Sequence, residues 1–180
     1  MPGWARWAPW QGEAGRADAD TLPLGRIGIR AERGTDRPCS LTRPEQISLL
    51  TLWLISRSPL MTGGDLPTRP PETIGLLTDD EALAVLWHGT GNREALRENG
   101  LVLWTARDTD GRTRYAAVSS PAGEALRYEV PLGSVAARPG GRIREPWTHT
   151  DVPHDGRHLT VDLPAHGAAL FRLTEDGGRG

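Results

Sequence analysis

The feature that most constrains the fold is a series of short apolar segments between residues 92 and 175 that no helical pattern interrupts. Apolar and polar residues alternate within them, as at Leu159, Val161 and Leu163, which is typical of strands that bury one face. Thr109-Asp110-Gly111 is a hairpin turn signal between two segments. Short strands at regular spacing predict a small antiparallel β-sandwich. The expected strands cover residues 101–104, 114–119, 126–130, 159–163 and 168–173.

Residues 41–87 carry a helical pattern instead. Thr42 followed by Glu45 forms a capping box, which predicts the start of a helix. Through residues 47–55 the apolar side chains recur at helical spacing on nearly every side. A helix of this kind must be buried on most of its surface.

The segments that follow this helix suggest an α/β unit. Residues 60–62 are short enough for a buried strand, residues 72–77 favour another helical piece, and a second capping signal begins at Thr78. Helix, strand and helix in that order are typical of α/β structure, so the fold class is α/β followed by all-β. The expected division is an α/β segment at 1–87, an antiparallel β-sandwich at 88–175 and a disordered tail at 176–180.

Composition and charge exclude several classes of function. A net charge of −2 disfavours a nucleic-acid partner held by phosphate attraction. All 21 basic residues are arginine, so no lysine can form a Schiff base or bind phosphate. The single cysteine, Cys39, excludes an internal disulfide and a multi-cysteine metal site. No signal peptide and no membrane-spanning run are visible, so we expect a cytoplasmic protein with no membrane partner.

Asp18 and Asp20 are the most suggestive pair of acidic residues. On an extended segment, carboxylates at i and i+2 point to one face, about 6–7 Å apart, which is close to the ~5–5.5 Å used by retaining glycosidases. The alternative is that both acids belong to a turn or cap before Leu22.

The histidines offer little for a metal or a cofactor. His154 and His158 stand four apart, as metal ligands on a helix do, but Pro153 and Gly156 favour a turn there. We expect neither a metal site nor a bound cofactor.

Two stretches of the sequence resemble the melibiase-type α-galactosidases, which are retaining glycoside hydrolases. The segment D-A-D-T-L-P-L-G at residues 18–25 is similar to the family's D-A-D-M-L-P-L-G. The segment L-W-L-I-S-R-S-P-L-M-T-G-G-D-L-P at residues 52–67 is similar to the family's next segment. Weaker similarity continues through residues 100–104 and 163–173, so the resemblance covers nearly the whole chain in order.

The resemblance implies the last units of a β/α (TIM-type) barrel, followed by the family's C-terminal β-sandwich. It also implies that both catalytic carboxylates lie upstream of the D-A-D segment, so no residue of this chain is expected to be catalytic. Asp20 matches a sugar-pocket residue and Thr21 its apolar neighbour, which makes these two the expected substrate-binding residues. The chain departs from the family at Arg16 and Ala17, where the family has Trp-Pro, and at Thr21, where it has Met.

Three hypotheses follow for the function. The first is the C-terminal fragment of a retaining hydrolase of terminal α-galactosides, inactive alone. The second is a non-catalytic sandwich module that binds a carbohydrate or a partner. The third is a complementing half that needs a missing N-terminal barrel chain or self-association. A partial barrel would leave sheet edges open and one face of the helix at 47–55 bare.

Overall fold

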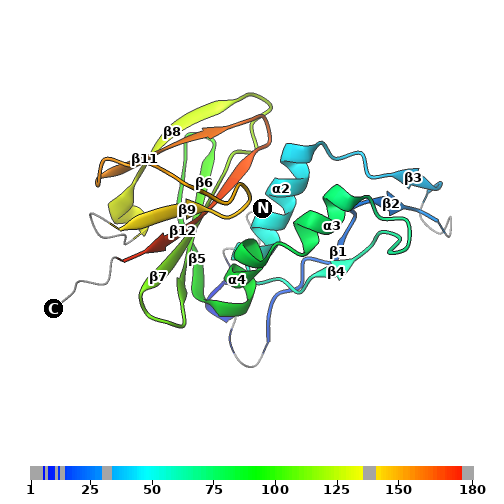
Figure 1. The fold of residues 1–180 in the computed structure, drawn as a ribbon, viewed down its shortest axis with the longest axis horizontal. Coiled ribbons are helices and arrows are strands. Elements are labelled where there is room, and N and C mark those ends of the chain that lie inside the picture. The colour runs from blue at the N-terminus through cyan, green and yellow to red at the C-terminus, as the bar shows by residue number, and fades with distance from the viewer. Residues whose placement is uncertain are drawn as a thin grey trace.

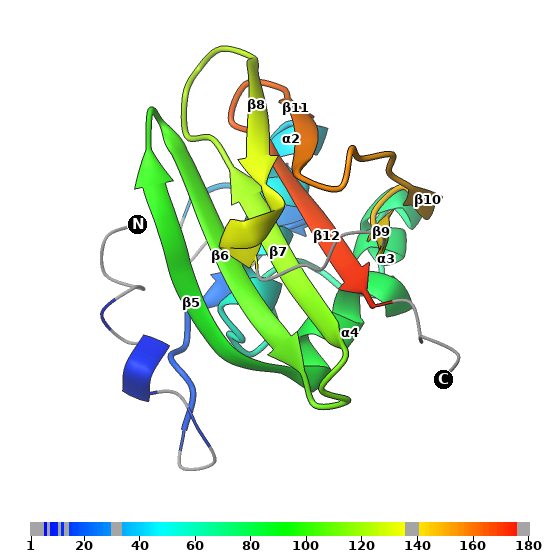
Figure 2. The same cartoon turned by 90° about the vertical axis from the view of Figure 1, so that its left-hand side faces the viewer.

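The computed structural model describes residues 6, 8–10, 12, 15–29, 34–135 and 141–175. A two-stranded sheet covers one face of a six-stranded sheet, and helices cover the other face (Figures 1 and 2). The short strands of the first half lie beyond the helices (Figure 1). Within the described ranges no helix is long and apolar enough to cross a membrane.

The six-stranded sheet is antiparallel at every pairing and has the order β10-β9-β12-β7-β6-β5. The predicted turn at Thr109-Asp110-Gly111 joins β6 to β7, and Gly111 has a φ of 73°, a left-handed conformation that favours glycine. The strands are β5 (Gly89–Glu98), β6 (Leu101–Asp108), β7 (Thr113–Ser119), β9 (Arg142–Glu145), β10 (Thr150–Asp151) and β12 (Ala168–Thr174).

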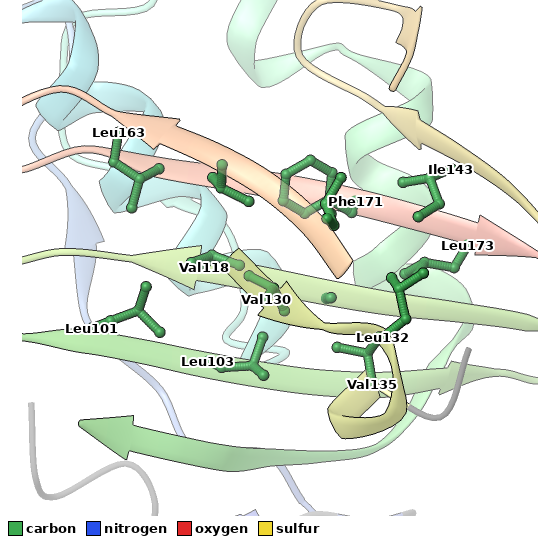
Figure 3. Close-up of a cluster of buried hydrophobic side chains, with 13 residues drawn as sticks. Leu101, Leu103, Val118, Val130, Leu132, Val135, Ile143, Leu163, Phe171 and Leu173 are labelled. Carbon is green, nitrogen blue, oxygen red and sulfur yellow. The ribbon is translucent and has the colours of Figure 1, made fainter. Parts of the chain in front are cut away.

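A second sheet closes the sandwich and encloses the main core. It pairs β8 (Leu126–Pro131) with β11 (His158–Leu163). Figure 3 shows the buried side chains that meet between the sheets, among them Leu103, Val130 and Phe171. The alternation in the sequence places these residues on facing surfaces, so the predicted antiparallel sandwich is confirmed.

The opposite face of the six-stranded sheet packs against two helices, α2 (Arg43–Ile55) and α4 (Asp80–His88). Val102, Trp104 and Leu170 from the sheet form one buried cluster with Leu54 and Val85 from the helices. Each central strand therefore buries both of its faces, which explains why residues 101–104 are continuously apolar.

Side-chain hydrogen bonds attach α2 to the sandwich. The Asn92 amide, 6% exposed, donates from Nδ2 to the Ile55 carbonyl at 2.6 Å. The Trp147 indole donates to Thr51 Oγ1 at 2.8 Å. No residue of α2 between positions 44 and 55 is exposed, so the expectation that this helix has a bare face is wrong. The sandwich itself, together with the first-half strands, covers it.

The first half consists of short elements around α2. Strands β1 (Thr21–Leu22) and β4 (Met61–Thr62) pair in parallel, with α2 between them in the chain. A third core cluster, which includes Leu22, Leu50 and Trp53, lies under these strands. The remaining elements are η1 (Ala8–Trp10), β2 (Arg26–Ile27), β3 (Arg37–Pro38), α3 (Pro71–Leu77) and η2 (Leu132–Val135).

Four local predictions from the sequence can be compared with the structure. The capping box of Thr42 and Glu45 is present at the start of α2. The strand at residues 60–62 is not buried, because Met61 is 45% exposed. The cap of α4 is Asp79 rather than Thr78, since Asp79 Oδ1 accepts from the Ala82 amide at 2.9 Å. The tail at 176–180 lies outside the described residues.

A charged cluster joins α4 to the β9–β10 hairpin. The His149 ring places Nε2 3.1 Å from Asp79 Oδ2 and Nδ1 3.0 Å from Glu81 Oε1. Arg144 Nη2 donates to Glu81 Oε1 at 2.7 Å. The hydrogen bond from Arg144 lowers the pKa of Glu81 to about 2, and the hydrogen bond with Glu81, followed by the Asp79 charge, raises the pKa of His149.

These shifts predict a window of pH in which the cluster stabilises the fold. The pKa of His149 is raised above its ordinary 6.5, so its contribution is complete below that value and is lost as pH rises through the folded pKa. The pKa of Glu81 is lowered from 4.5, so its contribution is present above 4.5 and is lost as pH falls toward 2. Urea unfolding of wild type and His149→Gln should therefore differ most near pH 5–6. A difference that stays constant up to pH 9 would contradict the assignment.

Candidate sugar-binding edge

The candidate site lies at the short parallel pair formed by β1 and β4 (Figure 1). In folds built from β/α units, ligands bind outside the carboxyl ends of the strands. The loops that leave β1 and β4 line a surface groove there, together with the β2–β3 hairpin. Groove residues include Thr21, Pro23, Arg26, Gly63, Gly64 and Asp65.

Asp18 and Asp20 form a turn and do not form an extended pair. Asp20 has a φ of 72°, in the left-handed region, and its amide donates to Asp18 Oδ1 at 2.9 Å. Asp20 Oδ1 in turn accepts from the Thr21 amide at 2.7 Å. The turn alternative is therefore correct, and the hypothesis of an extended acid and nucleophile pair is not supported.

Two buried groups hold this turn in place. Ser58 is fully buried, and its Oγ accepts from the Ala19 amide at 2.9 Å. The Trp53 indole nitrogen lies 3.4 Å from the Asp20 carbonyl oxygen, to which it donates. The side chains of Asp20 and Thr21 are exposed, so the turn presents a carboxylate and a hydroxyl to solvent on a supported backbone.

The loop after β4 is tied to the loop after β1 through backbone contacts. The Gly63 amide donates to the Leu22 carbonyl at 2.9 Å, and the Asp65 amide donates to the Arg26 carbonyl at 2.8 Å. Between them Gly64 approaches the loop after β1 so closely that a Cβ on it would lie 2.0 Å from the Leu24 carbonyl oxygen. Only glycine fits at that position.

Arg69 completes the support of this edge, although sequence analysis did not select it. Its side chain is 8% exposed, and Nη2 donates to the Gly64 carbonyl at 3.0 Å. The same side chain packs beside Gly25, 3.6 Å from where its Cβ would be. Arg69 thus contacts both loops. The only sequence signal was its place just after the 52–67 segment.

The other candidate residues are not brought to this edge. His154 Nε2 contacts the Gly141 carbonyl at 2.8 Å, and its Nδ1 accepts from the Gly156 amide at 3.1 Å, which confirms the turn. His158 lies in β11. Within the described ranges, no group of three histidine, cysteine or acidic residues could hold a metal ion.

Comparison with known proteins identifies relatives that share this architecture. Residues 98–173 match the family model described as the alpha galactosidase C-terminal beta sandwich domain. Alpha-galactosidase D of Emericella nidulans is 27% identical over 88% of this chain and 23% of its own length. An alpha-galactosidase of Oryza sativa subsp. japonica is 23% identical over 94% of this chain and 38% of its own length.

Solved structures agree over a longer stretch. A GH27 β-L-arabinopyranosidase from Geobacillus stearothermophilus superposes with a TM-score of 0.92 at 35% identity, over 99% of this chain and 41% of the solved one. The fold is that of the C-terminal part of such enzymes, in which the last units of a β/α barrel are followed by an antiparallel sandwich. The chain corresponds in sequence and fold to the C-terminal portion of the melibiase-type (GH27) enzymes, and its residues 98–173 match the C-terminal sandwich of the alpha-galactosidases. It spans between 23% and 42% of the length of the curated relatives that it matches.

Proposed function

We propose that residues 18–25 form one side of the sugar pocket of a retaining α-galactoside hydrolase, with Asp20 and Thr21 contacting the sugar. The observation that supports this most is the supported turn that leads into β1, where Asp20 is exposed in a left-handed conformation next to the groove residue Thr21. A non-glycine residue in that conformation has an energetic cost, and such residues concentrate at functional sites. An exposed carboxylate can accept hydrogen bonds from neighbouring sugar hydroxyls.

We also propose that this chain by itself does not hydrolyse α-galactosides. Hydrolysis with retention needs two carboxyl groups about 5–5.5 Å apart across the glycosidic bond. Asp18 is used by the turn, and the resemblance assigns both catalytic carboxylates to the part of the family that precedes residue 18. The acid and the nucleophile must therefore come from other strands of the barrel.

Those strands would pair with the open edges of the β1–β4 sheet. In the described part of the chain, β1 and β4 pair with each other alone. Parallel sheets normally have both faces covered, yet Thr21 and Met61 are exposed on this one. A β/α chain that adds parallel strands here would cover that face and complete the pocket. Self-association through the same edges is the competing outcome.

The experiment that tests this function is a chimera. The barrel portion of the G. stearothermophilus β-L-arabinopyranosidase, whose structure this chain matches, is joined to the full 180 residues. Aryl α-galactoside and aryl β-L-arabinopyranoside are both assayed, because the relatives include enzymes named for each sugar. We expect turnover by the chimera and none above buffer by the chain alone.

Substitution then assigns the role of Asp20. In the chimera, Asp20→Asn should lower kcat/KM at least about 100-fold, as loss of a charged ligand to the transition state does. Asp18→Asn is the matched control, because an asparagine oxygen still accepts from the Asp20 amide and should change kcat/KM little. Equal losses in both variants, or turnover by the chain alone, would reject the assignment. Binding of an α-galactoside by the chain without turnover would favour the binding-module hypothesis.

A further inference from the structure

A cavity separate from the sugar-binding edge lies between α2 and the six-stranded sheet. We name it the junction pocket. One wall is the side of α2 that faces the sheet, and the other is formed by β6 and by the segment that leaves β7. Its main lining residues are Leu52, Trp53, Val102, Trp104, Ser119 and Pro121. The pocket therefore spans the two layers that the fold joins.

The walls of the junction pocket are formed mostly by aromatic and aliphatic side chains. Trp53 from α2 and Trp104 from β6 are 6% and 4% exposed, so both rings are held by the surrounding core. Leu52, Val102 and Pro121 line the space between them. Pockets lined by aromatic and aliphatic side chains, with few polar groups, favour ligands with an apolar ring.

The polar groups around the pocket carry no unpaired charge. Arg97, at the rim, donates from Nε and Nη2 to both oxygens of Glu94 at 2.8 and 2.6 Å. Ser48 Oγ donates to the His166 carbonyl oxygen at 2.6 Å. With its cation already neutralised, the pocket offers no advantage to an anionic ligand.

One hydroxyl of the lining still lacks a partner. Among the described residues, Ser119 Oγ makes no hydrogen bond and is not sealed from the pocket. A ligand with a hydroxyl of its own could pair with it, and a purely apolar ligand would leave it unpaired at a cost.

We propose that the junction pocket is a second binding site, which takes a small uncharged ring compound carrying a hydroxyl group. The Trp53 indole that forms one wall also donates to the Asp20 carbonyl at 3.4 Å. A ligand in the pocket therefore contacts a side chain that supports the turn at the sugar-binding edge. This inference goes beyond the proposed hydrolase function and does not rest on it.

The test uses 4-fluorobenzyl alcohol as the probe and the fluorine NMR signal as the readout, with the full chain. We expect saturable binding with a Kd on the order of 1 mM, since the probe is small. Leu52→Phe, which fills the pocket from α2, should weaken binding at least about tenfold. Leu66→Phe is the matched control, because Leu66 is 66% exposed outside the pocket and should leave the Kd unchanged.

Two measurements keep the proposal falsifiable if Leu52→Phe fails to fold. Ser119→Phe fills the pocket from the opposite wall and should have the same effect. Nuclear Overhauser contacts in wild type should join the probe to the Trp53 and Trp104 rings and not to Trp87, which is 56% exposed. No saturable binding up to about 10 mM, equal binding by all variants, or contacts to Trp87 alone would overturn the proposal.

Discussion

Replacing Gly64 by alanine should lower the free energy of unfolding by about 3 kcal/mol. The added Cβ would lie 2.0 Å from the Leu24 carbonyl oxygen and 3.2 Å from the Arg26 carbonyl oxygen. Both obstacles are backbone atoms, so no flexible side chain can move away. The loop after β4 would have to separate from the loop after β1, which breaks the contacts that form the sugar-binding edge.

Gly75→Ala is the control for this substitution. Gly75 is exposed within α3, and no atom lies within 4 Å of a Cβ placed on it. Alanine there should stabilise the protein by about 0.5–1 kcal/mol, because glycine in a helix is the less favourable residue. Urea unfolding of both variants measures the two changes. A Gly64→Ala variant as stable as wild type would show that the loops do not pack as described.

The sandwich could be predicted because its strands carry their burial pattern in their own residues. In β11 the side chains of Leu159, Val161 and Leu163 are buried and the intervening ones are exposed. The strands that sequence reasoning missed lack this pattern. β5 is an edge strand with charged residues along it, and β9 reads Arg-Ile-Arg-Glu. Their pairing is decided by neighbouring strands, which local alternation does not report.

The burial of α2 could be predicted from its apolar pattern, but the partner that covers it could not. A pattern of this kind requires burial without stating which surface provides it. The structure provides it through the outer face of the six-stranded sheet, where Trp104 and Leu170 contact the helix layer. The burial of individual tryptophans could not be predicted either. Trp53 and Trp104 are core residues, whereas Trp87 is 56% exposed, and composition alone could not separate them.

At the candidate site, the sequence supplied the residues through a resemblance and the structure supplied the geometry. Asp20 and Thr21 were selected because they match a family segment. The left-handed conformation of Asp20 is accompanied by contacts with Trp53 in α2 and by the hydrogen bond of its neighbour Ala19 to Ser58, just after that helix. Arg69 escaped selection because its role arises only when two separate loops meet. Such tertiary contacts leave no local signal.

Truncation of Leu170 should have the second large effect, and it tests whether the helices and the sandwich unfold together. Leu170 is fully buried in β12 and lies in the cluster that α2 and α4 share with the sheet. Leu170→Ala should cost about 3 kcal/mol, from lost apolar burial and the cavity left behind. Leu66→Ala, at a residue 66% exposed, should stay within about 0.5 kcal/mol of wild type.

The readouts for Leu170→Ala are tryptophan fluorescence and far-ultraviolet circular dichroism, followed through the same urea titration. Because Asn92 and Trp147 hydrogen-bond α2 to the sandwich, we expect both signals to shift together to lower urea in a single transition. A structure in which α2 merely rested on the sheet would behave differently. The helical signal would then be lost first, at a urea concentration that leaves the sandwich folded, and Leu170→Ala would widen the separation between the two transitions. Coincident transitions in wild type and variant would show that α2 and the sandwich form one cooperative unit through the outer face of the six-stranded sheet.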